Sequence, residues 1–197
     1  MKNVTITSQP FTDFISTEDA KEYLEIDDTD TSHDSLLEKL VKSATKFIKN
    51  QTRRELIETT YQEIIDGEDN AVLFLSEYPI NSVTNIKIAD VTVYENDESQ
   101  DSSSFYIYKD TAMIRRSSVF PDDFLNIEVN YTAGWSQENL PEDLTQACKE
   151  LVSFKFNNKD FVGLESHSLG DEDLTFKRKD VPEEMLAVID SYRRRLI

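Results

Sequence analysis

The spacing of apolar residues changes twice along the chain and predicts three successive stretches. Up to residue 57 the apolar positions recur every three or four residues, which is the period of a helix with one buried face. From about Thr59 they alternate with polar positions in short β-branched and aromatic runs, as strands do. The helical period returns at Pro141. We therefore predict an α+β fold, in which a small bundle of about four helices, formed by 1–57 and 136–197, carries a β insertion at 58–135.

Two helices are expected ahead of the β insertion. Ser16, with Asp19 three residues later, approximates a capping box and predicts the start of a short helix. The polar linker after that helix offers Ser32 or Asp34 as the cap of a second helix, and it lacks the glycine that a calcium-binding loop needs. The second helix has one apolar stripe that we expect to face a core, made of Leu36, Leu37, Leu40, Val41, Ala44, Phe47 and Ile48.

Basic residues are interleaved with that apolar stripe. They are Lys39, Lys42, Lys46, Lys49, Arg53 and Arg54. One interpretation is a solvated face whose long side chains cover the helix. The other is an inter-subunit basic face, formed by Lys39, Lys42, Lys46, Lys49 and Arg53, that pairs with an acidic neighbour such as another copy of the same chain.

The β stretch is expected to form five or six short strands joined by polar turns. Residues 66–70 and 109–110 are typical of hairpin connections, and residues 95–104 form an acidic, serine-rich loop. Because no helix separates the strands, an antiparallel sheet or a small β-barrel-like subdomain is favoured.

The second helical part is predicted to contain two helices and a long polar loop at 157–180. Pro141 is tolerated in a first helical turn, because the N–H that it lacks would be unpaired there. Cys148 falls on the apolar side of this helix, so we expect a small buried residue rather than a nucleophile. Asp180 with Glu183 predicts the cap of the last helix, which ends in three arginines.

The chain of 197 residues has a formal net charge of −18, and this charge is unevenly placed. Residues 58–135 hold 15 acidic and 4 basic residues, a net charge of −11, so tight DNA binding by this stretch is disfavoured. The acidity either keeps the protein soluble or provides a surface that lies near nucleic acid without adhering to it. The single cysteine excludes an internal disulfide and fits a reducing compartment. No apolar run is long enough to span a bilayer, and the N-terminal residues lack the apolar core of a signal peptide.

The sequence offers no constellation of residues that would carry catalysis. Its two histidines, His33 and His167, lie in polar segments, and the adjacent Ser166 and His167 have no evident third group to orient them. No cysteine and histidine cluster has zinc spacing, and the four glycines are scattered rather than gathered in a phosphate-binding loop. We therefore predict a protein that is not an enzyme, with no catalytic residue, metal or cofactor.

Three stretches of the sequence form an ordered set of motifs. The first is FLSEYPINSVTNIKI at 74–88, in which Tyr-Pro-Ile is followed by Ser-Val. The second is VNYTAGW followed by LPEDLTQACKELVSF, which combines a strand, a corner and a helix. The third is the segment 163–195, where a loop with Gly and Ser precedes a Pro-started helix and Tyr-Arg-Arg. Together with the N-terminal helical pair, this set resembles the head–tail connector, or adaptor, proteins in the neck of tailed phages over nearly the whole chain.

The resemblance implies a structural virion protein with a helical core and a β insertion. Members of that family form a ring, generally of twelve copies, beneath the portal protein at the head–tail interface. The ring extends the channel through which double-stranded DNA passes without specific binding, and it offers a docking surface to the next neck or tail-completion protein. By this resemblance the chain is expected in the host cytoplasm during assembly and in the virion of a phage or prophage afterwards, with no membrane partner.

Two further sets of residues are predicted to matter for assembly. The candidates for contact with the portal or the adjacent subunit are Gly163, Glu165, Ser166, His167, Ser168, Gly170, Lys177, Arg178, Lys179, Arg193, Arg194 and Arg195. A structural corner is expected where the β insertion returns to the helices, and it comprises Tyr78, Pro79, Ile80, Tyr131, Gly134, Trp135 and Pro141. Gly134 lets the backbone turn closely, and Trp135 is large enough to fix the corner.

Three other functions are left open by the sequence. Within the same class, the chain would be a different neck or tail-completion protein. A carbohydrate- or peptide-binding module would use Phe105, Tyr106 and Tyr108 as an aromatic patch, although strand aromatics more often pack across strands. A hydrolytic enzyme is the third alternative.

Overall fold

A computed structural model describes residues 2–95, 105–158 and 181–194 of the chain. The chain forms two compact units. The first, termed the β unit, consists of Met1–Phe11 and Glu55–Glu138, and the second, termed the helical unit, consists of Thr12–Arg54 and Asn139–Ile197. The predicted α+β fold class is confirmed, because the described residues form four α-helices and two antiparallel sheets.

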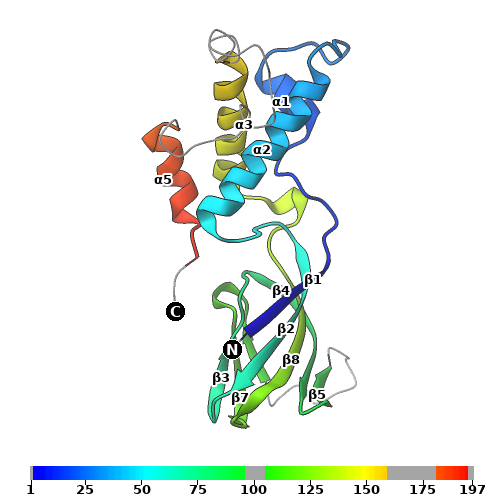
Figure 1. The fold of residues 1–197 in the computed structure, drawn as a ribbon, viewed down its shortest axis with the longest axis vertical. Coiled ribbons are helices and arrows are strands. Elements are labelled where there is room, and N and C mark those ends of the chain that lie inside the picture. The colour runs from blue at the N-terminus through cyan, green and yellow to red at the C-terminus, as the bar shows by residue number, and fades with distance from the viewer. Residues whose placement is uncertain (1, 96–104, 159–180, 195–197) are drawn as a thin grey trace. The chain divides into compact units, whose positions relative to one another are not determined.

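The β unit consists of two sheets that share one core (Figure 1). Its strands are β1 (Lys2–Ser8), β2 (Thr59–Gly67), β3 (Asn70–Phe74), β4 (Ile80–Ile88), β5 (Val91–Glu95), β6 (Phe105–Tyr108), β7 (Met113–Phe120) and β8 (Asp123–Ala133). The larger sheet has the order β1-β2-β8-β4-β5 and the smaller one β3-β7-β6, and all neighbouring strands are antiparallel. Every second residue of β2 is buried, and the core also contains Ile127 of β8 and Ile114 of β7.

The strand β1 departs from the predicted division of the chain. The sequence assigns residues 1–57 to the helical part, but Lys2–Ser8 pairs with β2 and belongs to the β unit. All seven residues of β1 are exposed. An edge strand of this kind is held by main-chain hydrogen bonds, which any sequence can supply, so the pattern of apolar residues gives little sign of it.

Of the two predicted hairpin connections, one is confirmed and one is wrong. Residues 109–110 lie in the 3₁₀ turn Lys109–Thr111 (η2), which joins the paired strands β6 and β7. Residues 66–70 join β2 to β3, which lie in different sheets, so they do not form a hairpin. A third turn, at Ala89 and Asp90, joins the paired strands β4 and β5. Turn composition indicates that the chain reverses but does not determine which strands pair afterwards.

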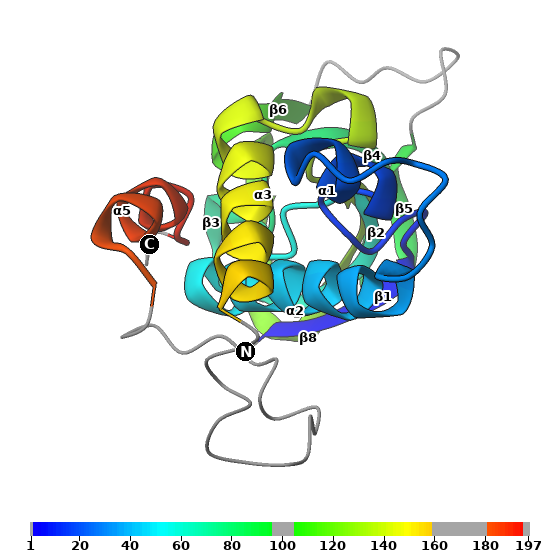
Figure 2. The ribbon, with the colours of Figure 1, turned by 90° about the horizontal axis from the view of Figure 1, so that it is seen from above.

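The helical unit contains α1 (Thr17–Tyr23), α2 (Asp34–Thr52), α3 (Glu142–Asn157) and α5 (Glu183–Ser191). Helix α2 contacts the other three, and α1 and α3 lie on the same side of it (Figure 2). The apolar stripe of α2 is buried as predicted, except that Leu36 is only half-buried. Helix α3 contributes its own buried stripe of Leu144, Ala147, Cys148, Leu151 and Val152.

The predicted capping box of α1 is confirmed. Asp19 N–H donates to Ser16 Oγ at 3.0 Å, and Ser16 N–H donates to the Asp19 carboxylate at 2.7 Å. Burial by itself would raise the pKa of Asp19, but the hydrogen bonds from Ser16 and the charge of Lys149 outweigh burial and lower that pKa. The box therefore stabilises the start of α1 most when Asp19 is ionised.

The predicted cap of α2 is wrong. His33 holds the N-cap position and makes no side-chain hydrogen bond there. Ser32 N–H donates to Asp30 at 2.8 Å, and Asp34 forms an ion pair with Lys21 at 2.5 Å. A carboxylate with a nearby ammonium partner binds it rather than the helix end, and sequence spacing does not show that partner.

Candidate functional site

Two motifs that lie far apart in the sequence meet at one corner of the β unit. Gly134 N–H donates to Pro79 O at 2.9 Å. Trp135 N–H donates to Leu56 O, and Glu58 N–H donates to Trp135 O, both at 2.8 Å. The Tyr-Pro-Ile motif and the Gly-Trp motif are therefore two halves of one joint, to which residues 56–58 add a third segment.

Only glycine fits at position 134. Its φ is +99°, which is a backbone conformation that side chains disfavour. A Cβ atom there would lie 2.5 Å from Ile57 O and 2.8 Å from Leu56 O. The side-chain amide of Asn81 also donates to Gly134 O at 3.0 Å and to the Glu58 carboxylate at 2.9 Å. Close backbone approach therefore specifies the corner, and the Asn81 amide adds side-chain hydrogen bonds to it.

The remaining corner residues have separate structural roles. The Tyr78–Pro79 peptide bond is cis, and Ile80, the first residue of β4, is buried. The side chain of Trp135 is half-buried. Pro141 belongs to the helical unit, where it holds the N-cap position of α3.

Tyr131 takes part in a buried polar network of the β unit. Its hydroxyl donates to the Glu63 carboxylate at 2.8 Å, and Ser76 donates to the same carboxylate from its N–H at 3.0 Å and its hydroxyl at 2.8 Å. Lys2 adds an ion pair at 3.4 Å. Burial first, and then the negative charge of Glu63, raise the pKa of Tyr131 far above its ordinary value, so the phenol remains a donor. This network joins β1, β2 and β8.

The predicted basic face, termed the basic stripe, consists of Lys39, Lys42, Lys46 and Lys49 on α2 and of Arg53, the C-cap residue of that helix. The four lysines are three or four residues apart, which keeps them on one side of the helix, whereas Arg53 has a left-handed backbone with a φ of +57°. That side is opposite the buried stripe of α2. All members are exposed except Lys49, which is half-buried. At 1.5 Å per residue the four lysines span about 15 Å of α2.

Two other arginines of the helical unit, Arg54 and Arg194, form hydrogen bonds within that unit. Arg54 is buried, and its guanidinium donates to Tyr192 O at 3.2 Å. Arg194 N–H donates to Thr52 O at 2.9 Å, so the end of α5 is tied to the end of α2. Arg193 is exposed. Of the arginines predicted as contact residues, Arg193 is therefore the one that the described structure leaves fully on the surface.

The other predicted contact residues lie outside the described residues. They are Gly163, Glu165, Ser166, His167, Ser168, Gly170, Lys177, Arg178, Lys179 and Arg195. Asp180, the predicted cap of α5, also lies outside them, and Pro182 holds the N-cap position of that helix.

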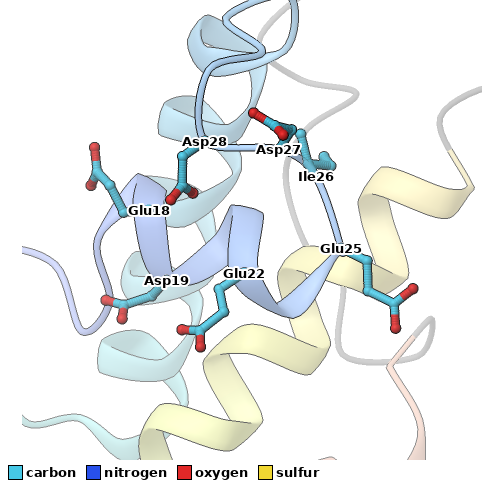
Figure 3. Close-up of a pocket in the computed structure, with 7 residues that line it drawn as sticks. All are labelled: Glu18, Asp19, Glu22, Glu25, Ile26, Asp27 and Asp28. Carbon is cyan, nitrogen blue, oxygen red and sulfur yellow. The ribbon is translucent and has the colours of Figure 1, made fainter.

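Acidic residues gather around α1 and the loop that follows it (Figure 3). They line a hollow together with Ile26 and are Glu18, Asp19, Glu22, Glu25, Asp27 and Asp28. All except Asp19 are exposed, and we term these five exposed residues the acidic edge. Asp27 accepts a hydrogen bond from Thr29 N–H at 2.9 Å, and the bonds from Thr29 lower the pKa of Asp27. This surface is not among the sites predicted from the sequence, where seven acidic residues lie between 18 and 30.

The described side chains that the sequence offers as candidates for chemistry are packed within the fold. Cys148 is buried, and burial raises the pKa of its thiol to about 12. His33 packs edge-on against Phe156 at a centroid distance of 5.3 Å. No group of three or more His, Cys, Asp or Glu residues in the described ranges is placed to hold a metal ion. Within the same ranges no helix has both the length and the hydropathy of a membrane span.

The aromatic patch of the ligand-binding alternative is divided between two faces of the smaller sheet. Tyr106 and Tyr108 are exposed, whereas Phe105 is buried and packs against Tyr94 at a centroid distance of 5.4 Å. Alternate residues of a strand point to opposite faces, so Phe105 belongs to the core and not to the predicted patch.

Comparisons with known proteins identify the relatives of this fold. Residues 13–195 match the family model described as "Head completion protein". A chain in the neck of an empty gene transfer agent (GTA) particle computed with C6 symmetry has a TM-score of 0.66 and 17% identity, covering 99% of this chain and 97% of that chain. A chain in the neck of a native GTA particle computed with C12 symmetry has a TM-score of 0.62 and 20% identity, covering 100% and 97%. A comparison with curated protein sequences gives no match.

The two kinds of finding support statements of different reach. At 17% and 20% identity, the likeness to the neck chains shows a common fold over nearly the full length of both proteins. The family match is a sequence match and covers more than nine tenths of the residues. The chain therefore belongs to the head completion protein family.

Proposed function

We propose that the chain is a structural, non-enzymatic protein of a tailed-phage virion that completes the head at the head–tail interface. The observation that carries this proposal is the family match over residues 13–195. The fold shared with neck chains of GTA particles supports the same location. On this proposal the chain is present in the host cytoplasm during assembly and in the neck of the finished particle.

The finer part of the proposal concerns the assembled state. Copies of the chain form a ring of twelve on the portal protein, extend the DNA channel, and present a surface to the next neck or tail-completion protein. The C6 and C12 symmetries of the two GTA necks support such a ring. A net charge of −18 suits a channel through which DNA slides, because few cations are available to hold phosphates.

Deletion of the gene from the phage or prophage that encodes the chain tests the proposed function. We expect cells to produce heads that contain DNA but do not carry tails, counted by negative-stain electron microscopy. The wild-type gene supplied in trans is the control and should restore tailed particles. Infectious tailed virions in normal number without the gene would contradict the proposal.

Addition of purified chain to tailless heads tests the portal contact. The segment 163–179 and Arg193 are the proposed contact residues, so a variant that lacks 163–179 should leave more chain unbound after sedimentation of the heads. A variant that lacks 96–104, in the β insertion, is the matched control for loss of a polar segment. Equal binding by all three proteins would remove 163–179 from the contact.

A further inference from the structure

We propose that neighbouring copies of the chain bind head to tail, with the basic stripe of one copy against the acidic edge of the next. The inference rests on the proposed function, which requires several copies in one ring, and it names the surfaces by which they meet. The structure supplies three observations for it: the geometry of the stripe, the charge of the edge, and the directions in which the two surfaces face.

The basic stripe is a docking surface rather than a scatter of cations. A spacing of three and four residues holds its four lysines in one line on the side of α2 that faces away from the core, and Arg53 follows at the end of the helix. Within the line, Lys42 has a local partner, Glu38, at 2.5 Å. Residues 34–54 contain six basic and two acidic residues, so this part of the helical unit is positive on a chain whose net charge is −18. A surface of opposite sign to its own chain is attracted to the rest of another copy.

The acidic edge has the complementary character. Lys21 is the one basic residue between 18 and 30, and it is buried and forms its ion pair with Asp34. The positive charge of Lys149, on α3, lowers the pKa of the half-buried Asp19, which is not part of the edge. The exposed carboxylates of Glu18, Glu22 and Glu25 therefore present an excess of negative charge to solvent, and Asp27 and Asp28 extend it along the loop.

The two surfaces do not face each other within one copy. Helix α1 and the residues before it approach α2 through Asp34, which pairs with Lys21, and Thr45, whose hydroxyl accepts a hydrogen bond from Phe14 N–H at 3.2 Å. Thr45 is buried on the core side of α2, where Figure 2 places both α1 and α3. The stripe points the other way, so a second copy is needed to bring stripe and edge together. A contact between two different surfaces of identical chains is heterologous, and such contacts generate rings when the rotation closes.

Double-stranded DNA is the competing occupant of the stripe, and the charge of the chain argues against it. Binding to DNA requires cations to outweigh the repulsion between phosphates and the protein's own acidic surface. The stripe provides five cations, whereas the chain contains 39 acidic residues. Another copy offers the stripe five exposed carboxylates in one place, which matches its number of cations.

Charge reversal on the full-length chain tests the contact. The stripe variant is Lys42→Glu with Lys46→Glu, and the edge variant is Glu22→Lys with Glu25→Lys. We expect each variant to load on tailless heads at least about tenfold less well than wild type, because like charges then meet at every interface. The four-fold variant that combines both pairs should recover loading to within about threefold, since opposite charges again face each other.

A control with the same net charge separates local pairing from overall charge. Asp110→Lys with Glu138→Lys changes two exposed acidic residues of the β unit and is added to the stripe variant. This chain has the net charge of wild type but a mismatched interface, so it should load as poorly as the stripe variant. Recovery by this control would overturn the inference, because net charge alone would then explain the result.

The outcomes for the inference and for the proposed function are distinct. If wild type does not bind tailless heads, the proposed function fails and the inference fails with it. If wild type and both single-surface variants bind in equal number per head, the inference is overturned and the proposed function stands. If the stripe variant assembles normally but loses DNA affinity in a gel-shift assay with a duplex, the stripe is a DNA surface and not a contact between copies.

Discussion

Glu63 is a fully buried carboxylate whose partners come from three different parts of the β unit. Tyr131 and Ser76 donate hydrogen bonds to it, and Lys2 of the edge strand β1 pairs with it. A buried charge is stable only while its partners remain, so loss of one partner costs more than an ordinary surface change. The network therefore gives Tyr131 a role in stability that its position in the VNYTAGW motif does not reveal.

The first prediction concerns Tyr131→Phe. Removal of the hydroxyl that donates to Glu63 should lower the free energy of unfolding by about 1.5 to 3 kcal/mol, which is the usual effect of a hydrogen bond to a charged group. Urea titration followed by circular dichroism measures it. Tyr106→Phe removes an exposed hydroxyl of the same type and should change the value by less than about 0.5 kcal/mol. Equal effects of the two changes would show that the hydrogen bond to Glu63 does not contribute to stability.

Gly134→Ala is expected to destabilise the β unit strongly. The alanine would have to adopt a disfavoured φ, and its methyl group would meet two backbone oxygens, which cannot move as a side chain could. We expect a loss of at least about 2 kcal/mol, seen as a lower Tm. Ala89→Gly is the control, because φ at Ala89 is also positive but glycine relieves the conformation there. A Tm within one or two degrees of wild type for Gly134→Ala would contradict the account.

Cys148 predicts how stability changes at high pH. Its pKa is 9.0 when unperturbed and about 12 in the folded chain, so above pH 9 the unfolded chain loses a proton that the folded chain keeps. Stability from this thiol is complete below pH 9 and is lost as pH rises from 9 toward 12, by up to about 1.4 kcal/mol per pH unit. Urea unfolding at pH 8, 9 and 10 should show a steeper decline for wild type than for Cys148→Ala. Equal declines in the two proteins would show that another group causes the loss of stability at high pH.

At the scale of elements, the β4–β5 turn carries an unusual sequence. Ala89 and Asp90 have φ values of +48° and +63°, the pattern of a type I′ hairpin turn, which strongly prefers Asn-Gly. Ala89→Asn with Asp90→Gly should therefore raise the free energy of unfolding by about 1 kcal/mol. Ala89→Val, which places a β-branched residue at positive φ, should lower it. Thermal unfolding of the two variants beside wild type decides, and no gain from Asn-Gly would contradict the turn assignment.

The sequence predicts the type of most elements but not their pairing. Apolar spacing identifies α2 and α3, because each buries one stripe, and it identifies β2, because every second residue is buried. It does not reveal β1, whose residues are all exposed, nor that residues 66–70 lead into a second sheet. Periodicity reports which side of an element is buried, whereas pairing depends on contacts between distant residues.

The candidate sites, like the elements, are only partly predicted from the sequence. The basic stripe is visible in the sequence because helical spacing places its four lysines on one side of α2. The corner is only partly visible, since Pro79 and Gly134 belong to separate motifs and the hydrogen bond between them appears only in the fold. The acidic edge was missed because 39 acidic residues make any local group unremarkable until burial removes Lys21 from the surface.

At the scale of the whole molecule, the net charge determines how strongly the chain binds nucleic acid. The sequence stretch 58–135 has a net charge of −11, whereas the basic stripe is a positive surface of the helical unit. If stripes are covered by neighbouring copies, an assembled ring presents mostly acidic surface. DNA that passes such a ring would meet few cations, so counterion release would contribute little to binding.

The last prediction is that the isolated chain binds duplex DNA only weakly. At about 150 mM salt its dissociation constant should lie above about 10⁻⁴ M, the weak limit of ordinary non-specific binding, because repulsion by the net charge of −18 opposes the five cations of the stripe. Fluorescence anisotropy with a labelled duplex measures this affinity across a salt series. The stripe variant with Lys42→Glu and Lys46→Glu should be as weak as wild type at 150 mM salt and should differ only at low salt, where screening is reduced. Micromolar binding by wild type that this variant abolishes would make the stripe a contact with DNA in the channel.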